Sequence, residues 1–522
     1  MLELNKIYNM DNMEGLKLLE DNSIDSIVTD PPYGLGKEPN ATDMLQAWIN
    51  SGYLEINGSG FMGKKWDSFV PQPIFWKEVY KVLKPGGHIL SFFGSRTYDW
   101  GVMAMRLAGF EIRDQIIWIY GSGFPKSSNI GKAVDTFRGN KKEVVGVERG
   151  TSYKHQSKIN VEQGFRPSDY YDDNIGEFKI TKGNSEWEGW GTNLKPAHEL
   201  IVLARKPIKE NTIVKNVLKY GTGGINIDEC RIGLNGESAP TGSAKRIFKS
   251  NAYTDKKIYG DNKITPIAGR FPANLLLECT CDELIKEGED KLPYEYKNKE
   301  YNVKGFINNI KPNSPSNYND KNKKIYHTNP NCPCYILDMQ SGQLKSGDNN
   351  TCTQEGTFVE HGGLGHAGDV QVSYGDSGGA SRFFYQAKVS KKERNEGLTH
   401  LEPKQMDESR KEGNPGGDNP RNRGVNKTNN FHPTVKPIAL MRYLVKLITP
   451  KNGICLDPFI GSGTTGIACK LEKINFIGFE LENDYFNIAT ERLKYYSEPE
   501  EKIIKDKKII KKEINKNNNK FI

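Results

Sequence analysis

Several features that would mark a membrane, secreted or disordered protein are missing from the 522 residues of this chain. No run of about 18 apolar residues occurs, and the start lacks a basic and then apolar stretch, so neither a membrane span nor a secretory signal is expected. Only eight cysteines are present, which in a long chain of this kind favours reduced thiols over disulfides. We therefore expect a cytoplasmic protein. Aromatic residues make up 10% of the chain, which is sufficient for a folded core.

The excess of positive over negative charge is small outside one end of the chain, although the formal net charge is +8. The stretch 502–522 carries eight lysines against Asp506 and Glu513, so the remaining residues are nearly neutral. We expect a basic tail over 497–522. Its charge alone does not indicate that the body of the protein binds nucleic acid.

Short apolar runs alternate with helical periodicity near both ends of the chain. Strands are expected at 24–29, 88–94, 110–121 and 199–207, and a strand, helix, strand, helix series follows 453. Such alternation is typical of an α/β fold with a parallel sheet. The middle is rich in Asn, Gly and Lys, so the expected organisation is two α/β pieces, 1–210 and 431–496, that flank an insert, 211–430.

A glycine-rich loop, "LDPFIGSGTTG", lies between an expected strand and helix near the end of the chain. No lysine follows Gly466, which excludes a phosphate-binding loop of the GxxxxGK type, whereas the glycine spacing alone leaves a nicotinamide dinucleotide open. Asp457 precedes the glycines and Glu480 ends the next strand. Glu480 can hold a ribose diol, and an extra acid would repel a pyrophosphate but suit a cationic ligand such as S-adenosylmethionine. A tight turn that binds no ligand is the alternative.

The glycine loop and a second motif near the start of the chain resemble motifs of the DNA amino-methyltransferases. "DPFIGSGTTG" with Glu480 is similar to their motifs I and II, and "DPPY", Asp30 to Tyr33, is similar to their motif IV. Because motif IV comes first and motif I comes late, the chain resembles the β group of phage and restriction–modification enzymes. The resemblance covers about 1–210 and 431–495, and it includes "FMGKKWD", "LKPAHELIVLARKP" and "HPTVKP". It implies a Rossmann-like class I AdoMet-dependent methyltransferase sheet, circularly permuted, with a large target-recognition insert.

The DPPY motif gives the expected catalytic residues. An exocyclic amine is a poor nucleophile because its lone pair is delocalised into the base, so it needs acceptors for both of its N–H groups. Asp30 supplies one acceptor and the Pro31 carbonyl the other, Pro32 helps to fix the backbone, and Tyr33 offers a ring to stack on a base flipped out of the duplex. A rigid turn that ends a strand is the alternative.

The resemblance also implies a set of cofactor contacts. Asp11 would accept a hydrogen bond from the adenine amine of the cofactor, although a helix N-cap is an equally good interpretation of this residue. The complete expected set for S-adenosylmethionine is Asp11, Asp457, Pro458, Phe459, Gly461, Gly463, Thr464 and Glu480.

Several functions remain to be separated. Asp at the first motif IV position favours adenine-N6 methylation without deciding against cytosine-N4. The one Pro-Cys pair, Pro333-Cys334, lacks the surroundings of a cytosine-C5 nucleophile, and a protein-glutamine methyltransferase would carry the glycine loop first. A DNA-binding protein with a vestigial cofactor pocket is the non-enzymatic alternative. The expected partner is double-stranded DNA, with no membrane; a homodimer and a restriction nuclease partner stay open.

The insert carries two further patterns. Cys279, Cys281, Cys332 and Cys334 form two Cys-x-Cys pairs with His327 nearby, which suits a structural zinc ion, although buried cysteines also serve as small apolar side chains. We expect the insert to read the target sequence. Its candidate DNA contacts are Lys245, Arg246, Arg270, Arg382, Lys391, Lys392, Arg394, Arg421 and Arg423.

Overall fold

A computed structural model describes most of both ends of the chain and parts of its middle. The described residues are 2–56, 65–121, 127–140, 143–149, 177–232, 270–281, 284–286, 325–330, 332–342, 344–345, 377–388, 392–405 and 427–497. The expected basic tail lies outside them, apart from Ser497. They divide into two compact units, one formed by Met1–Asn226 with Ala387–Ile522 and the other by Ile227–Gln386.

The first unit is an α/β structure. Its strands are β1 (Lys6–Asn9), β2 (Ile24–Thr29), β3 (Leu83–Phe93), β4 (Glu111–Ile119), β5 (Glu143–Arg149), β6 (Glu177–Lys182), β7 (His198–Arg205), β14 (Lys404–Gln405), β15 (Lys427–Thr428), β16 (Ile454–Asp457) and β17 (Asn475–Glu480). Its helices are α1 (Asn12–Lys17), α2 (Ala41–Asn50), α3 (Pro73–Val82), α4 (Tyr98–Leu107), α5 (Ile130–Arg138), α7 (Ile213–Tyr220), α9 (Ile438–Ile448), α10 (Thr464–Leu471) and α11 (Asn483–Tyr495).

Seven of these strands form one sheet in the order β1-β17-β16-β2-β3-β7-β4. Neighbours from β1 to β3 are parallel, and β7 runs antiparallel to both β3 and β4. The last two strands of the chain thus lie between its first two. This order confirms the expected Rossmann-like, circularly permuted sheet, because strands from the two ends of the chain complete one layer.

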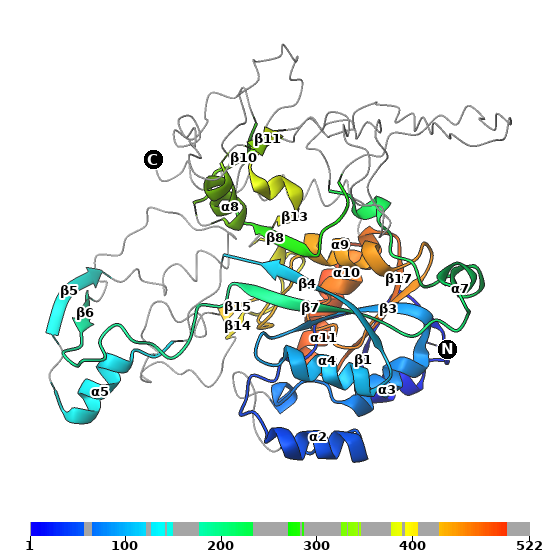
Figure 1. Cartoon of the computed structure of the whole chain (residues 1–522), viewed down its shortest axis with the longest axis horizontal. Helices are drawn as coiled ribbons and strands as arrows, with labels where there is room; N and C mark the ends of the chain where they lie inside the picture. Colours follow the sequence, from blue (N-terminus) through cyan, green and yellow to red (C-terminus); the bar gives the residue numbers. More distant parts are fainter. Residues whose placement is uncertain are drawn as a thin grey trace, which may run out of the picture. The chain divides into compact units, whose positions relative to one another are not determined.

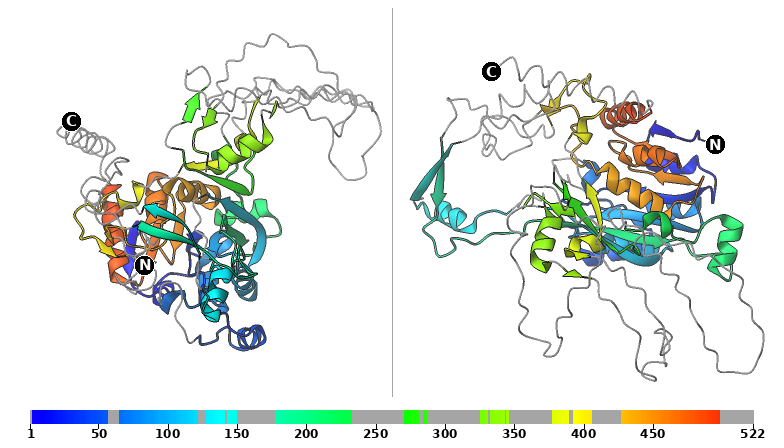
Figure 2. Two further views of the ribbon diagram at one scale, coloured as in Figure 1. Left: turned by 90° about the vertical axis from the view of Figure 1, so that its left-hand side faces the viewer. Right: turned by 90° about the horizontal axis from the view of Figure 1, so that it is seen from above.

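Helices cover both faces of this sheet (Figure 1; Figure 2). α3 packs against α1 and α4, and α10 packs against α9 and α11 in a second group. The main core lies under the first group, where Trp76 and Val79 of α3 are fully buried against Ile89 and Phe93 of β3. α3 is amphipathic and begins with Pro73, which is well suited to the first turn of a helix.

The "KPGG" stretch behaves differently from the sequence-based expectation. The strand expected at 88–94 begins earlier, because β3 starts at Leu83 and runs through these residues. Gly86 has a φ of +82°, and a Cβ there would lie 2.4 Å from Asn216 Nδ2. The strand therefore continues because a glycine takes up the unusual backbone conformation beside α7.

The second unit, Ile227–Gln386, is smaller than the 211–430 insert expected from composition. α7 belongs with the first unit, since Asn216 Nδ2 donates to the Pro85 carbonyl at 2.8 Å. Elements within the second unit include β8 (Leu275–Cys279), β9 (Leu284–Lys286), β10 (Ile325–His327), α8 (Pro333–Ser341), β11 (Leu344–Lys345) and β12 (Ser377–Gly378). β13 (Tyr385–Lys388) spans the boundary. No helix in the described parts of the chain is long and apolar enough to cross a membrane.

Two arginines expected to contact DNA are instead buried in the second unit. Arg270 Nη1 donates to the Arg382 carbonyl at 3.1 Å, and Arg382 Nη1 donates to the Gly379 carbonyl at 2.8 Å. Both guanidinium groups also lie over the Phe383 ring. These side chains hold the unit together. Lys245, Arg246, Lys391, Arg421 and Arg423 lie outside the described residues, and Lys392 is exposed.

Candidate active site

The permuted sheet brings the two main motifs together. β2 and β16 are parallel neighbours, with Ile27 opposite Leu456, so their carboxyl ends lie side by side. Thr29 Oγ1 donates to Asp457 Oδ1 at 2.7 Å, which ties the end of β2 to the end of β16. DPPY and the glycine loop therefore start from adjacent points of one sheet edge, although nearly the whole chain separates them in sequence.

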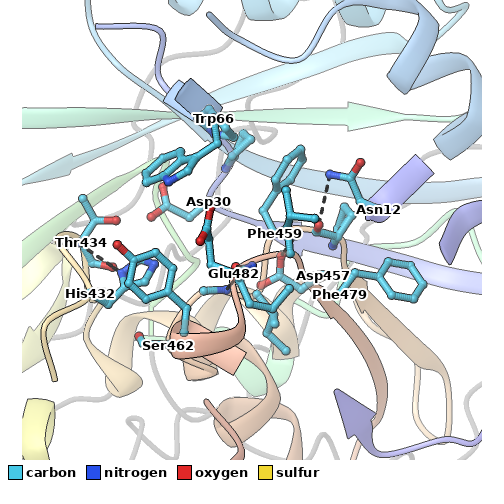
Figure 3. A pocket seen from close by; sticks show the side chains of 18 of the residues that line it. Asn12, Asp30, Trp66, His432, Thr434, Asp457, Phe459, Ser462, Phe479 and Glu482 are labelled. Carbon is cyan, nitrogen blue, oxygen red and sulfur yellow. Dashed lines mark hydrogen bonds between the residues drawn. The ribbon is translucent and has the colours of Figure 1, made fainter. Parts of the chain in front are cut away.

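A cavity of about 280 Å³ lies over this edge. Figure 3 shows the Asp30 carboxylate and the Trp66 ring on one side of the pocket and Phe459 with Asn12 across from them. Its lining includes Asp11, Asp30, Pro31, Pro32, Tyr33, Trp66, Asp67, His432, Lys436, Asp457, Pro458, Phe459, Gly461, Ser462, Thr464, Phe479, Glu480, Glu482 and Tyr485. The cavity thus collects residues from DPPY, from the glycine loop and from "HPTVKP".

The two carboxylate oxygens of Asp30 differ in their hydrogen bonding. Lys436 Nζ donates to Asp30 Oδ2 at 2.6 Å and also lies 3.2 Å from Glu199 Oε2. The other oxygen, Asp30 Oδ1, is buried and has no hydrogen-bond partner among the described residues. Because a buried acceptor without a partner is costly, this oxygen is suited to receive a donor from a bound molecule.

Lys436 is a fully charged group inside this cluster. Burial lowers its pKa, but Asp30 and Glu199 raise it more, so the net pKa is above the ordinary lysine value. Tyr33 joins the same network: its hydroxyl donates to Glu199 Oε2 at 2.9 Å and accepts from Lys436 Nζ at 3.1 Å. Burial and the neighbouring Asp30 raise the pKa of Tyr33 well above its usual value, so the phenol stays protonated.

The loop after DPPY is fixed by Asp67, which follows Trp66 in "FMGKKWD". Asp67 Oδ1 accepts from the backbone N–H groups of Tyr33 at 2.8 Å and of Gly34 at 3.0 Å. Thr97 Oγ1 donates to the Tyr33 carbonyl at 2.5 Å. These contacts set the position of the two prolines and the tyrosine from outside the motif, so the loop is preorganised.

The glycine loop turns sharply from β16 into α10. Gly461 and Gly463 have φ values of +53° and +82°, and a Cβ on Gly461 would lie 2.7 Å from His432 Nε2. Arg492, which is fully buried, donates from Nη1 to the Ser462 carbonyl at 2.6 Å, with Thr464 Oγ1 3.1 Å away. Both glycines are therefore required by backbone geometry and close packing.

Two acids flank the glycine loop with different partners. Asp457 accepts from Thr29, from Thr465 Oγ1 at 2.5 Å and from the Phe459 N–H at 3.1 Å, so its role in the structure is to hold the loop. Burial raises its pKa to about 6. Glu480 accepts from the backbone N–H groups of Gly461 and Glu482, each at 2.9 Å, and burial raises its pKa to about 7.

The remaining predicted cofactor residues also lie at the cavity. Asp11 is the N-cap of α1, since its Oδ1 accepts from Met13 N at 2.8 Å, and it lines the pocket as well. The Pro458 carbonyl accepts from Asn12 Nδ2 at 3.4 Å, and the Phe459 ring packs against Phe75. The predicted catalytic and cofactor residues thus line one pocket, except Gly463, which lies in the same loop without lining it. The four cysteines of the proposed zinc set lie in the second unit.

Five residues at or behind the pocket were not assigned roles from the sequence. Lys436, Glu199, Trp66 and Asp67 all fall in segments that carried the family resemblance, yet a single sequence gives no sign of which side chain meets Asp30. His432 is the fifth: it packs edge-on against Tyr485 at 4.5 Å between ring centroids, and burial lowers its pKa to about 3, so it is neutral. Arg394, expected to contact DNA, donates to the carbonyls of Asn430 and His432.

Comparisons with known proteins extend these observations. The type II methyltransferase M.HindIII of Haemophilus influenzae is 48% identical over 63 residues, 12% of this chain and 20% of that protein. M.HpaI of Haemophilus parainfluenzae is 30% identical over 167 residues, 31% of this chain and 48% of that protein. The chain therefore spans less than half the length of either curated relative.

Solved structures show a more distant likeness. PvuII DNA methyltransferase, described as cytosine-N4-specific, is 12% identical with a TM-score of 0.35, over 97% of this chain and 92% of that one. The M1.HpyAVI–SAM complex is 14% identical with a TM-score of 0.30, over 94% and 98%. Likenesses this distant say nothing of the base that is modified.

The family is shown by a profile match. The profile described as DNA methylase, for N6 and N4 methyltransferases, matches residues 24–491, which is most of the chain. This chain therefore belongs to the N6/N4 DNA methylase family.

Proposed function

We propose that this protein is an S-adenosylmethionine-dependent DNA methyltransferase that acts on the N6 amine of adenine in duplex DNA. The observation that carries the proposal is Asp30 Oδ1, a buried acceptor without a partner in the cavity beside the glycine loop. A target base flipped out of the duplex presents an amine N–H to such an acceptor.

The pocket fits a cationic cofactor without phosphates. Lys436 is the only basic side chain among the described lining residues, and it is already paired with Asp30 and Glu199. The lining acids are Asp11, Asp30, Asp67, Asp457, Glu480 and Glu482. A pyrophosphate would be repelled here, whereas S-adenosylmethionine carries an ammonium and a sulfonium. The nicotinamide dinucleotide that the glycine spacing left open is therefore disfavoured.

Specific residues can hold each part of this cofactor. Glu480, at the end of β17, would accept from the ribose hydroxyls, and Phe459 would offer apolar surface to the adenine ring. When bound, the cofactor supplies an electrophilic methyl group on a positively charged sulfur.

The DPPY loop activates the amine by accepting hydrogen bonds from both of its N–H groups. Asp30 Oδ1 accepts one N–H and the Pro31 carbonyl accepts the other, which localises the nitrogen lone pair for in-line attack. Lys436 holds the second Asp30 oxygen at 2.6 Å, so the carboxylate is fixed in direction before the base arrives. Tyr33 is held by Glu199 and Lys436, and its ring is proposed to pack on the base.

The choice of adenine rests on Asp30 as the first motif IV residue. Cytosine-N4 is the second candidate function, because the cytosine amine presents the same two N–H donors to Asp30 and Pro31. A non-catalytic DNA-binding role is disfavoured by Asp30 and Lys436, since a buried, oriented carboxylate with an unused oxygen has no purpose in such a protein.

The DNA substrate and the role of the insert are also part of the proposal. We propose that double-stranded DNA is the substrate and that segments of the 211–430 insert read the target sequence. Of the candidate contacts, exposed Lys392 is the described residue whose side chain is available to DNA. A nuclease partner and a homodimer follow from the family resemblance alone, and cytoplasmic location stays an expectation from the sequence.

Cofactor affinity should depend on pH through Glu480. Burial raises the pKa of Glu480 to about 7, so the folded free protein loses stability as pH rises from about 4.5 through 7. The ionised carboxylate is nevertheless the better acceptor for two ribose hydroxyls. We expect the S-adenosylmethionine Kd to fall about tenfold from pH 6 to pH 8 by calorimetry. Glu480→Gln should bind weakly without this dependence, and Glu20→Gln, on the exposed surface, should behave as the wild type. A flat wild-type profile would contradict the assignment.

Methyl transfer from labelled S-adenosylmethionine tests the proposed function. The full chain should transfer the label to unmethylated duplex DNA and leave fully modified DNA from the same source unlabelled. Label that appears in protein instead, or in no acceptor at all although the cofactor binds, would refute the assignment.

A further inference from the structure

Four potential metal ligands converge within the second unit. Cys279 is the last residue of β8, His327 is the last of β10, Cys332 is the N-cap of α8, and Cys281 lies two residues beyond β8. The three sulfurs and a ring nitrogen of His327 all lie within 4.8 Å of one another. All four side chains are buried, with no residue more than 3% exposed.

The distances match tetrahedral coordination. His327 Nδ1 lies 3.5 Å from Cys279 Sγ, 3.5 Å from Cys281 Sγ and 4.0 Å from Cys332 Sγ. For zinc with Zn–S of about 2.3 Å and Zn–N of about 2.0 Å, a tetrahedron places nitrogen and sulfur about 3.5 Å apart. We propose that Cys279, Cys281, His327 and Cys332 bind one structural Zn²⁺ ion.

The surroundings favour thiolates over neutral apolar thiols. The backbone N–H of Asn329 points to Cys281 Sγ at 3.5 Å, which is the outer contact that a metal-bound sulfur accepts. Cys332 caps a nine-residue helix, whose N-terminus stabilises a negative sulfur. Without an ion, the His327 nitrogen would face three weakly polar sulfurs in a buried site. Such contacts would not compensate for the free energy that is lost when the nitrogen leaves water.

The ligand set differs by one residue from that suggested by the sequence. The two Cys-x-Cys pairs pointed to Cys334 as the fourth ligand, but the compact group contains His327 in its place. The Sγ atoms of Cys332 and Cys334 both lie 3.8 Å from the Glu278 carbonyl, so this contact does not distinguish the two cysteines. We assign Cys334 to the surroundings of the site, because the compact group of four ligand atoms excludes it and a closed zinc site takes four protein ligands.

A zinc ion at this position would join segments far apart in sequence. His327 is 48 residues from Cys279, and α8 follows directly after. The ion would crosslink β8, β10 and the start of α8. Four protein ligands leave no position for water or substrate, so the role is structural and independent of methyl transfer.

Metal analysis of the purified full chain tests this proposal. We expect one zinc per chain by mass spectrometry, and X-ray absorption should show three sulfurs at about 2.3 Å and one nitrogen at about 2.0 Å. Cobalt substitution should give the intense visible bands of a tetrahedral thiolate site. Less than about one zinc in five chains, together with no tetrahedral cobalt spectrum, would overturn the site. Four sulfurs and no nitrogen would overturn the assignment of His327.

Matched variants separate the ligands from their neighbours. His327→Gln and Cys281→Ser should each lose most of the zinc, whereas Cys334→Ser should retain it. Cys230→Ser, a buried thiol of the same unit, is the control and should keep one zinc per chain. Loss of zinc in Cys334→Ser with retention in His327→Gln would contradict the proposed set. Because ligand variants can fail to fold, the wild-type metal content decides the site itself.

Discussion

Replacement of Asp30 by alanine is expected to abolish methyl transfer while cofactor binding survives. The variant loses the buried Asp30 oxygen that has no partner among the described residues, and removing a preorganised electrostatic contact of this kind costs about 10²- to 10³-fold in kcat. Glu480 and the glycine loop are untouched, so the S-adenosylmethionine Kd should change less than about threefold, which corresponds to less than about 0.7 kcal/mol. Single-turnover transfer and calorimetry measure the two quantities separately.

Two further variants test whether the effect is specific to the Asp30 carboxylate. Asp30→Asn keeps the volume but presents an amide, so it should be nearly as inactive as the alanine variant if the charge and both acceptor oxygens matter. Asp43→Ala, an exposed acid in α2, should retain full activity. If Asp30→Ala keeps kcat within tenfold of the wild type, Asp30 does not hold the amine.

Loss of Lys436 should be the second large effect. Lys436→Met leaves Asp30 and Glu199 without their shared cation in a site where the lysine side chain is 7% exposed. Removing one partner of a buried ion pair costs about 3–5 kcal/mol of stability, so Tm should fall clearly. We expect kcat to fall about 10²-fold, because Asp30 loses the contact that fixes its direction. The cofactor Kd should change much less.

A double variant distinguishes positioning from stability. Lys436→Met with Glu199→Gln removes one of the two carboxylates left without a cation, so part of the lost Tm should return while kcat stays low. Lys446→Met, whose partner Glu472 lies 3.8 Å away in a more exposed site, should change stability by less than about 1 kcal/mol. Recovery of kcat together with Tm in the double variant would show that Lys436 only supports folding.

The sequence predicted the fold through local patterns and motif order. Ile24–Thr29 and Ile454–Asp457 are short apolar strands that end in polar motifs, and parallel strands place such ends at one edge. Adjacent placement of DPPY and the glycine loop was therefore predictable once the chain was understood as permuted. Asp11 as an N-cap was predictable for the same local reason.

Long-range partners were not predictable in this way. Nothing local indicates that Lys436 reaches Asp30 or that Arg394 holds the carbonyl of His432, because these contacts depend on how distant segments meet in three dimensions. Arg270 and Arg382 were expected to contact DNA because charge usually lies at the surface. Each instead donates to a backbone carbonyl and lies over the Phe383 ring inside the second unit.

The identity of the methylated nucleoside tests the central claim most directly. Unmethylated duplex DNA treated with the full chain and S-adenosylmethionine should be digested to nucleosides and analysed by mass spectrometry. The proposed chemistry at Asp30 and Pro31 predicts N6-methyladenine, absent when Asp30→Ala replaces the wild type. N4-methylcytosine would contradict the assignment of adenine, and DNA with no methylated base would contradict methyl transfer itself.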